Sequence, residues 1–416
     1  MKPYELCSGV NLHVIDGTKF KTHAIHVNLL WSMDQSKWAA SFLLSYLLAD
    51  TTFHYPTKKQ LLEQQDRLYG ASLNVLNTPR GACDALRFSL SGIHSLEEGE
   101  DLLEAGFELV GELLFYARLE DGVFPEAMFM ECREQAILSV RMAMDDPATE
   151  CAEAAIRAYG GAAGMRALPT VEELESLTSS QCAEVWEFIR RNARVDIQVL
   201  SCESTERIVE LTRRYFPFEA RVKQGAVICP YQSSELRVET SRDLPQTHLT
   251  MLFETGVRLN DSRYPALVLA NGLFGGLPSS LLFREVREAQ GLCYSIDSAL
   301  LSMDGLIRVM TAVEAEHLEE TITSITEQAE AIRNGSFEEE DLEMTKQMII
   351  NVYRASLDDP DSLLSYNYRQ ALIWEVQSIE ELCKTLGTIT KQELCDSIAS
   401  LRLTTISILH QNKEGE

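Results

Sequence analysis

The chain has 416 residues, of which 45% are hydrophobic and 24% are charged, a composition typical of a globular protein with two or three domains. The formal net charge is −26, from 37 basic and 63 acidic residues. This excess of carboxylates argues against nucleic acid or an anionic membrane as the main partner. It is compatible with a basic or amphipathic peptide ligand, although many cytosolic proteins are simply acidic.

The amino-terminal segment gives no sign of export. It lacks the apolar stretch of a signal peptide, and the longest apolar run, 38–49, is too short to span a membrane. The ten cysteines occur singly, without a CxxC pair, which favours reduced thiols over a disulfide framework or a zinc knuckle. We therefore expect a cytoplasmic protein.

The segment THAIHVNLL, which starts at Thr22, alternates as a half-buried strand does. His23 and His26 are three residues apart on this strand and should point to opposite faces, which is unsuitable for one metal ion. We interpret both histidines as structural.

The segment from Trp38 to Asp50 predicts a buried helix, because it is apolar on all sides except at Ser41 and Ser45. Small hydroxyls in such a helix are expected to hydrogen-bond to the carbonyls four residues earlier and to allow close packing. The alternative is a nucleophilic serine. It has little support, since the chain has no GxSxG motif and no histidine in a serine-hydrolase context.

An internal repeat divides the chain. The segment 124–147 aligns without a gap to 337–360, and both segments begin with Phe and end with Asp-Asp-Pro. Three further pairs of similar segments keep the same order; they start at Thr22 and Thr247, at Thr170 and Ser378, and at Arg194 and Arg402. Four anchors in one order indicate a duplication.

The repeat predicts an α+β fold with two homologous α/β-sandwich halves, each an antiparallel sheet covered by helices. We place the halves at 1–217 and 236–416, each large enough for its own core. The connecting segment 218–235 contains glycine, proline and a serine pair, and is interpreted as a linker.

The glycine run GLFGG at 272–276 lacks the Lys-Ser/Thr of a phosphate-binding loop and does not fit GxGxxG. It is interpreted as a turn after a buried helix.

The segment from Ser280 to Ile296 predicts a helix, a glycine stop and a strand. Leu282, Val286 and Ala289 share one helical face, which should be core, and Gly291 should end the helix. The strand follows from Leu292.

Arg287 lies off the predicted core face, and Tyr294 follows seven residues later on the strand. One interpretation makes both residues structural, with the arginine paired to Glu285 or Glu288 and the tyrosine packed. The other makes them a binding pair at the joint between helix and strand.

These features together resemble the insulinase–pitrilysin family of zinc metallopeptidases. The resemblance covers essentially the whole chain and is most specific from Ser280 to Ile296. It is closest to short two-domain members such as the subunits of mitochondrial processing peptidase. In that family the Arg and Tyr of this motif contact the substrate peptide near the scissile bond. The resemblance therefore implies that Arg287 and Tyr294 are substrate-binding residues that would hold a peptide carbonyl or a developing oxyanion.

Active members of the family carry HxxEH on the first long helix. The two His bind zinc, the Glu is the general base, and a downstream Glu is the third ligand. The matching positions here are Ser41, Leu44 and Ser45, and the downstream position falls at Leu138 or Ser139. The resemblance thus implies a degenerate zinc site, with no catalytic residue, no metal and no cofactor in this chain.

A chain of this kind is expected to be the non-catalytic, substrate-binding subunit of a heterodimeric zinc peptidase. Its partner would be a homologue with HxxEH and zinc, and the pair would bind and process a peptide or protein. On its own the chain would not be an enzyme. Some bacterial pairs of this kind are linked to modification of elongation factor P, and only the resemblance extends that to this chain.

The alternative is a structural or binding protein of the same fold with no role in proteolysis, as the mitochondrial respiratory core proteins are. A neighbouring gene for a similar chain with HxxEH would favour the peptidase subunit.

Overall fold

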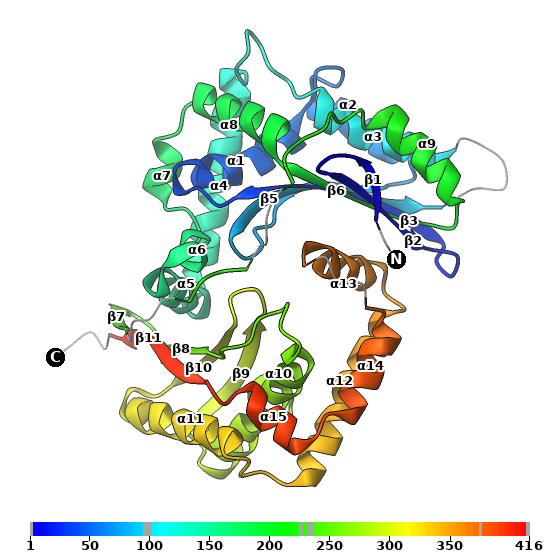
Figure 1. Ribbon diagram of the computed structural model, residues 1–416. Helices are drawn as coiled ribbons and strands as arrows, with labels where there is room; N and C mark the ends of the chain where they lie inside the picture. The colour runs from blue at the N-terminus through cyan, green and yellow to red at the C-terminus, as the bar shows by residue number, and fades with distance from the viewer. Residues whose placement is uncertain (1–2, 95–100, 224–227, 232–235, 374–376, 413–416) are drawn as a thin grey trace. The chain divides into compact units, whose positions relative to one another are not determined.

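The computed structural model describes residues 3–94, 101–223, 228–231, 236–373 and 377–412 (Figure 1). These residues form two compact units, each with its own sheet. Within the described part of the chain, no helix has both the length and the apolar character that a membrane crossing needs.

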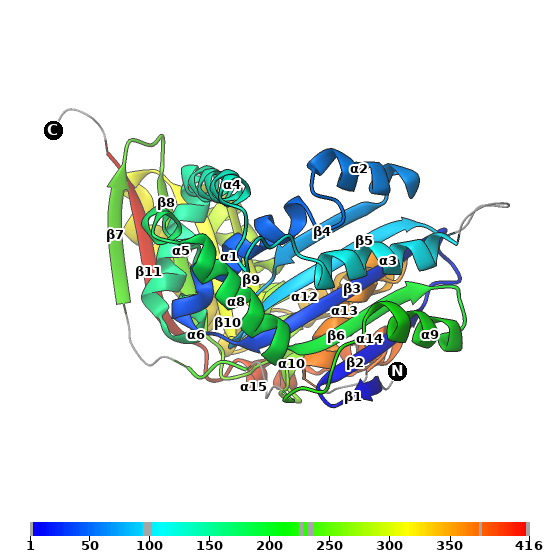
Figure 2. The same cartoon turned by 90° about the horizontal axis from the view of Figure 1, so that it is seen from above.

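The first unit has a six-stranded sheet in the order β1-β2-β6-β3-β5-β4, which Figure 2 shows from above. Its β2 and β6 are parallel, and its other neighbours are antiparallel. The strands are β1 (Tyr4–Cys7), β2 (Val10–Asp16), β3 (Thr22–Ser32), β4 (Ser72–Asn77), β5 (Cys83–Ile93) and β6 (Arg194–Ser201).

Helices cover both faces of this sheet. One face carries most of them, and α13 lies on the other (Figure 1). On α13, the carbonyls of Leu364 and Ala371 accept hydrogen bonds from Gln198 (3.0 Å) and Arg194 (3.2 Å) of β6. The helices are α1 (Gln35–Asp50), α2 (Lys58–Arg67), α3 (Leu102–Phe115), α4 (Glu126–Asp145), α7 (Val171–Glu175), α8 (Ser179–Asn192), α9 (Thr205–Tyr215) and α13 (Pro360–Leu372).

The second unit has a five-stranded sheet in the order β7-β11-β8-β10-β9, again with one parallel pair, β7 and β11. The strands are β7 (Leu236–Arg242), β8 (Thr247–Glu254), β9 (Cys293–Leu301), β10 (Leu306–Val313) and β11 (Arg402–Gln411).

The helices of the second unit are α5 (Pro147–Tyr159), α6 (Gly161–Met165), α10 (Tyr264–Asn271), α11 (Leu318–Arg333), α12 (Glu339–Ser356), α14 (Ile379–Thr388) and α15 (Lys391–Ser397). There are also two π-helical segments, η1 (Gly272–Gly276) and η2 (Leu282–Ala289), and the 3₁₀ turn η3 (Ala315–His317). Helix α5 packs against β8 and β11, whereas α11 and the helices around it lie on the opposite face (Figure 1).

The two sheets share one topology, which confirms the predicted duplicated α+β fold. The order β2-β6-β3-β5-β4 corresponds strand for strand to β7-β11-β8-β10-β9, with the parallel pair at the same place. The sequence anchors begin equivalent elements: Thr22 and Thr247 begin β3 and β8, and Pro147 and Pro360 begin α5 and α13. One detail was wrong, since each sheet is mixed and not purely antiparallel.

The compact units are not contiguous in sequence. The first contains 1–141, 168–226 and 360–376, and the second contains 142–167, 227–359 and 377–416. The first half of the repeat therefore gives α5 and α6 to the second unit, and the second half gives α13 to the first unit. The limits 1–217 and 236–416 stay a prediction for the duplication itself, and the predicted linker 218–235 lies partly outside the described residues.

Candidate functional site

The helix at the degenerate zinc position is α1. The Asp34 side chain caps it by accepting a hydrogen bond from the Ser36 amide (3.0 Å). Ser41, Leu44 and Ser45 are all buried, as the sequence predicted for this helix.

Both serine hydroxyls are engaged within the first unit. Ser41 donates toward the Trp38 carbonyl (2.9 Å) and the Asp84 carboxylate, and Ser45 donates to the Phe42 carbonyl (2.7 Å). The accepting carbonyls are three residues earlier, not four as expected. A serine hydroxyl in a helix can bond to either carbonyl, and both serines here use the nearer one.

Asp84, on β5, is the buried partner of this helix. Its Oδ1 accepts hydrogen bonds from Asn77 Nδ2 (2.9 Å) and from the Ala85 amide (2.8 Å), while Oδ2 faces Ser41. Burial raises the pKa of Asp84 to about 6, and the hydrogen bonds from Ser41, Asn77 and Ala85 oppose that shift. Where a zinc motif would need imidazoles, the chain therefore has a hydroxyl bound to a buried carboxyl.

The position expected for the third ligand lies on α4. Ser139 faces α1, because its Oγ accepts a hydrogen bond from the Tyr46 hydroxyl (2.6 Å) and donates to the Ala136 carbonyl (2.8 Å). Leu138 points outward and is 56% exposed. The two helices that would share a metal ion are joined instead by a tyrosine–serine hydrogen bond.

Hydroxyl and alkyl groups are poor substitutes for the imidazole and carboxylate ligands that zinc prefers. Throughout the described residues, no group of three or more His, Cys, Asp or Glu side chains could hold a metal ion. His23 and His26 are both buried in β3, and burial lowers the pKa of His23 to about 4 and that of His26 to about 3.

The second candidate site is the joint between η2 and β9. The segment η2 is π-helical, with the Gln290 amide bound to the Glu285 carbonyl five residues earlier (3.2 Å), and Gly291 follows with φ +68. Leu282 and Val286 are buried as predicted, but Ala289 is exposed. The wider π-helical turn explains this error, because it shifts each successive residue away from the α-helical face used for the prediction.

The glycine run 272–276 is also π-helical and continues α10, so its interpretation as a turn was wrong. The run lies against β9 and η2. A Cβ on Gly275 would come within 2.7 Å of Leu282 Cδ1 and 2.8 Å of Ser298 Oγ. Only glycine allows this approach, and π-helical segments inside helices are frequent at functional sites.

Arg287 lies between two aromatic rings. Its guanidinium carbon is 4.3 Å from the centroid of the Phe283 ring and 5.5 Å from that of Tyr294, within the range of cation–π attraction. The ion pair with Glu285 goes instead to Arg284, whose Nε is 2.9 Å from Glu285 Oε1. The two rings therefore position the Arg287 guanidinium, and no carboxylate of the described residues forms an ion pair with it.

Tyr294 is aimed outward by a β-bulge. Between Ile296 and Cys293, β9 advances three residues while β10 advances two, from Thr311 to Val313. The extra residue breaks the alternation, so Tyr294 and Ser295 are both exposed, and Tyr294 is 82% exposed. Bulges of this kind re-aim side chains at sheet edges and beside active sites.

The equivalent joint of the first unit lacks this pair. There α2 leads to β4 through Gly70, which has φ +73 as Gly291 has φ +68. Arg287 precedes Gly291 by four residues and Tyr294 follows it by three. The residues at the same distances from Gly70 are Asp66 and Leu73. The arginine–tyrosine pair is therefore a property of the second copy and not of the shared fold.

A family model described as the Peptidase M16 inactive domain matches residues 186–349, which include Arg287 and Tyr294. A Bacillus subtilis protein named probable inactive metalloprotease YmfF is 26% identical over 408 residues, 96% of each chain. The crystal structure of a conserved protein from Enterococcus faecalis V583 is similar with a TM-score of 0.92 at 26% identity, over 100% of this chain and 99% of that one.

The chain is an M16 peptidase homologue. A crystal structure described as a peptidase M16 inactive domain from Pseudomonas fluorescens shares the fold at 15% identity, with a TM-score of 0.81 over 100% of this chain and 99% of that one. The family model and the Bacillus subtilis relative confirm the predicted family, and the prediction of a non-catalytic homologue agrees with the description of that model and with the name of that relative.

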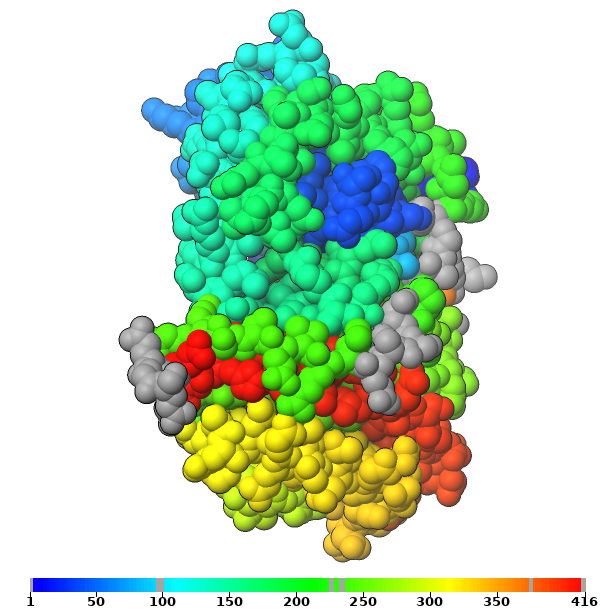
Figure 3. All heavy atoms as spheres, turned by 90° about the vertical axis from the view of Figure 1, so that its left-hand side faces the viewer, coloured from blue at the N-terminus to red at the C-terminus, as the bar shows by residue number. Residues whose placement is uncertain are grey.

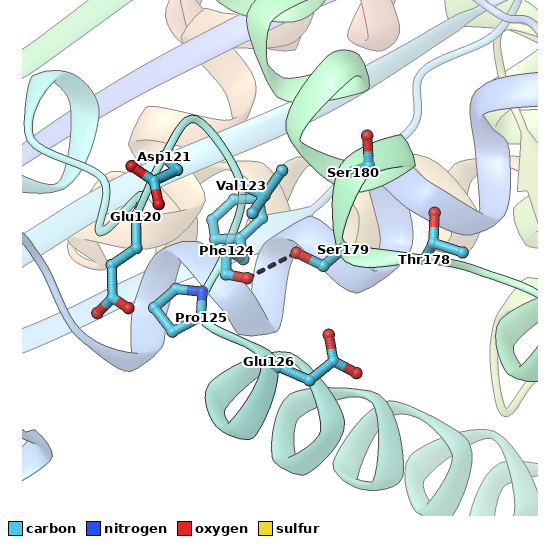
Figure 4. Close-up of a pocket in the computed structure, with 9 residues that line it drawn as sticks. All are labelled: Glu120, Asp121, Val123, Phe124, Pro125, Glu126, Thr178, Ser179 and Ser180. Atoms are coloured by element: carbon cyan, nitrogen blue, oxygen red, sulfur yellow. Dashed lines mark hydrogen bonds between the residues drawn. The ribbon is translucent and has the colours of Figure 1, made fainter.

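Sequence reasoning missed one surface feature of this M16 homologue, a pocket of about 470 Å³ in the first unit (Figure 4). It lies between the turn that precedes α4 and the start of α8. Its one buried hydroxyl, Ser179 Oγ, is already bound to the Phe124 carbonyl (2.6 Å). The lining residues are Glu120, Asp121, Val123, Phe124, Pro125, Glu126, Thr178, Ser179 and Ser180. They come from two segments that are distant in the sequence, each a loop with the first turn of the helix that follows it, and no motif in the sequence marks them as neighbours.

Proposed function

We propose that this M16 homologue is the non-catalytic, substrate-binding subunit of a heterodimeric zinc peptidase. Its partner would be a homologous chain that carries HxxEH and the zinc ion, and the pair would bind and process a peptide or protein. The observation that carries the proposal is the contrast between the two sites. The hydroxyls of Ser41, Ser45 and Ser139 are engaged in local hydrogen bonds. In contrast, the Arg287 guanidinium contacts the rings of Phe283 and of the exposed Tyr294.

The chemistry divides accordingly. A zinc ion in the partner would activate water and polarise the scissile carbonyl. Arg287 supplies guanidinium donors, and Tyr294 supplies a phenol that can donate one hydrogen bond. Preorganised donors aimed at a developing oxyanion stabilise the transition state without having to reorganise. The π-helical turn and the bulge would contribute to that preorganisation, because they set the backbone positions from which the two side chains project.

The test is purification of the chain from native cells, followed by identification of what is bound to it. The proposal predicts a homologue of similar length with HxxEH in about equimolar amount, and peptidase activity that is lost when the two chains are separated. Recovery of the chain without such a homologue, from cells that express both genes, would contradict the proposal. That result would favour a structural or binding role outside proteolysis.

A further inference from the structure

The two faces of the first sheet differ in chemistry. Residues that pair across neighbouring strands share a face, so the register sorts the side chains. The face that packs against α1, α3 and α8 is apolar, and in the space-filling view α1 (blue) lies against α8 (green) over it (Figure 3). Its buried side chains include Ile25, Val27, Leu29, Phe88, Ile197 and Val199.

The opposite face, which carries α13, is polar (Figure 1). Its side chains include His26, Asn28, Arg87, Ser89, Asp196 and Gln198. The one carboxylate of this set is already engaged, because Asp196 Oδ1 accepts hydrogen bonds from Arg194 Nη2 (3.0 Å) and Asn11 Nδ2 (3.0 Å). The charge of Arg194 is therefore compensated within the sheet.

Arg87, on β5, has no such compensation. Its Nε donates to Asn28 Oδ1 (3.0 Å), and its guanidinium carbon is 5.7 Å from the centroid of the Tyr368 ring on α13. The side chain is half-buried, and no carboxylate of the described residues forms an ion pair with it. Two neighbours thus orient the guanidinium and leave its terminal nitrogens available to a ligand.

The groups around Arg87 do not neutralise its charge. Tyr368 is 1% exposed, and its hydroxyl has no hydrogen-bond partner among the described residues. Burial raises the pKa of Tyr368, so the phenol stays neutral at physiological pH. Burial and the charge of Arg80 lower the pKa of Arg87, and the charge of Asp361 opposes this shift without an ion pair. A cation that is partly withdrawn from water and lacks a counter-charge favours a ligand that brings one.

The open side of Arg87 adjoins β4. Leu76 lies directly opposite Arg87 on that strand, and Asn74 lies opposite Ser89 at the next position of the same face. Leu76 and Asn74 are both exposed. A ligand that reaches the guanidinium would therefore also meet one apolar side chain and one amide.

We propose that Arg87 binds the free carboxylate of a ligand whose adjoining group packs on Leu76. The planar guanidinium can donate two parallel hydrogen bonds to a carboxylate. The net charge of −26 disfavours a dianion such as phosphate at a site with one uncompensated cation. The carboxylate could belong to a small acid or to the end of a peptide. The inference does not depend on the proposed function, because Arg87 belongs to the first unit and the Arg287–Tyr294 pair to the second.

The experiment titrates the isolated full chain by calorimetry at constant ionic strength. The probes are N-acetylleucine, its amide, the N-acetylated tripeptide Ala-Ala-Leu with a free carboxyl terminus, and inorganic phosphate. The two acids should bind about tenfold or more tightly than the amide, because the amide cannot form the charge-assisted pair, and phosphate should bind more weakly than the acids. Tighter binding of the tripeptide than of N-acetylleucine would assign the site to peptide termini, and equal affinities would assign it to small acids.

Arg87→Gln should lower the affinity for both acids to that of the amide, and Arg87→Lys, which keeps the charge and loses the planar fork, should give an intermediate value. Arg141→Gln makes the same charge change at an exposed position of α4 and should leave the affinities unchanged. Circular dichroism shows whether each variant is folded, and the comparison of acid with amide needs only the wild type.

The inference is overturned if the wild type binds neither acid, if acid and amide bind equally, or if phosphate binds more tightly than the acids. Unchanged affinity in folded Arg87→Gln would also overturn it. The proposed function fails separately, if no HxxEH homologue accompanies the chain in native cells.

Discussion

Asp84→Asn tests the hydrogen-bond network that stands where a zinc site would be. The pKa of Asp84 rises from 3.8 to about 6 in the folded chain, so the native state binds a proton more tightly than the unfolded chain does. At about 1.4 kcal/mol per pKa unit, the ionised carboxyl therefore costs about 3 kcal/mol of stability at pH 7.5 relative to the protonated form.

The sign follows from proton binding. Between pH 4 and pH 6 the folded state carries more protons than the unfolded state, so stability from this group falls as pH rises through that range. Between pH 5 and pH 7.5 the loss should be about 1.4 kcal/mol. The asparagine can keep every bond: its Oδ1 accepts from Asn77 and Ala85, its Nδ2 donates to Ser41 Oγ, and Ser41 then donates to the Trp38 carbonyl.

The assay is urea unfolding of the wild type and Asp84→Asn at pH 5 and pH 7.5. The variant should gain about 1.4 kcal/mol relative to the wild type between the two pH values, because it lacks the titrating group. Asp396→Asn is the matched control, since Asp396 is exposed on α15, and it should show no such gain. If the difference between Asp84→Asn and the wild type is the same at both pH values, the buried carboxyl does not titrate as described.

Four further variants test the geometry of the sites. Gly275→Ala should lower the free energy of unfolding by about 1–3 kcal/mol through overpacking, as measured by urea unfolding. Gly387→Ala in α14 is the control: its Cβ would meet only Ile350 Cδ1, at a relaxed 4.0 Å, so the variant should be neutral or more stable. Tyr46→Phe and Ser139→Ala should each lower the free energy of unfolding by about 0.5–1.5 kcal/mol, because each removes the hydrogen bond between the two side chains. A double-mutant cycle without coupling energy would contradict that hydrogen bond. Phe283→Leu should lower the peptidase activity of the reconstituted pair a few-fold and leave its zinc content unchanged. The reason is that the Arg287 guanidinium loses about 0.5–1 kcal/mol of cation–π attraction to the ring. Unchanged activity would mean that the ring does not position the guanidinium.

Local pattern was enough to predict the elements whose structure depends on neighbouring residues. The repeat indicated strands that begin at Thr22, Thr247, Arg194 and Arg402, and strands begin there. Helix α1 is buried, as predicted from the apolar residues on nearly all of its sides. Gly291 takes a positive φ after the helix, as a C-terminal glycine should. Each of these features is set within about one turn or one strand of sequence.

The features that were missed depend on contacts between distant residues. Ala289 is exposed because η2 takes the π-helical register, and that segment packs against the glycine run and β9. Asp84 is 43 residues from Ser41, so the serine predicted no partner. The exchange of α5 and α13 between units likewise has no local signal, because either helix could cover the sheet of its own half equally well by pattern.

The central claim is that this M16 homologue contributes substrate contacts and not a metal site. Its most direct test is to mix the HxxEH-bearing partner with the wild-type chain, Arg287→Ala or Tyr294→Phe, and to measure peptide cleavage, complex formation and melting temperature together. Both variants should bind the partner, and their free energies of unfolding should fall by no more than about 1 kcal/mol, the scale of an exposed cation–π contact. Their turnover should fall about 100-fold or more, as the loss of an oxyanion donor does. Cleavage at the wild-type rate by both variants would contradict the claim.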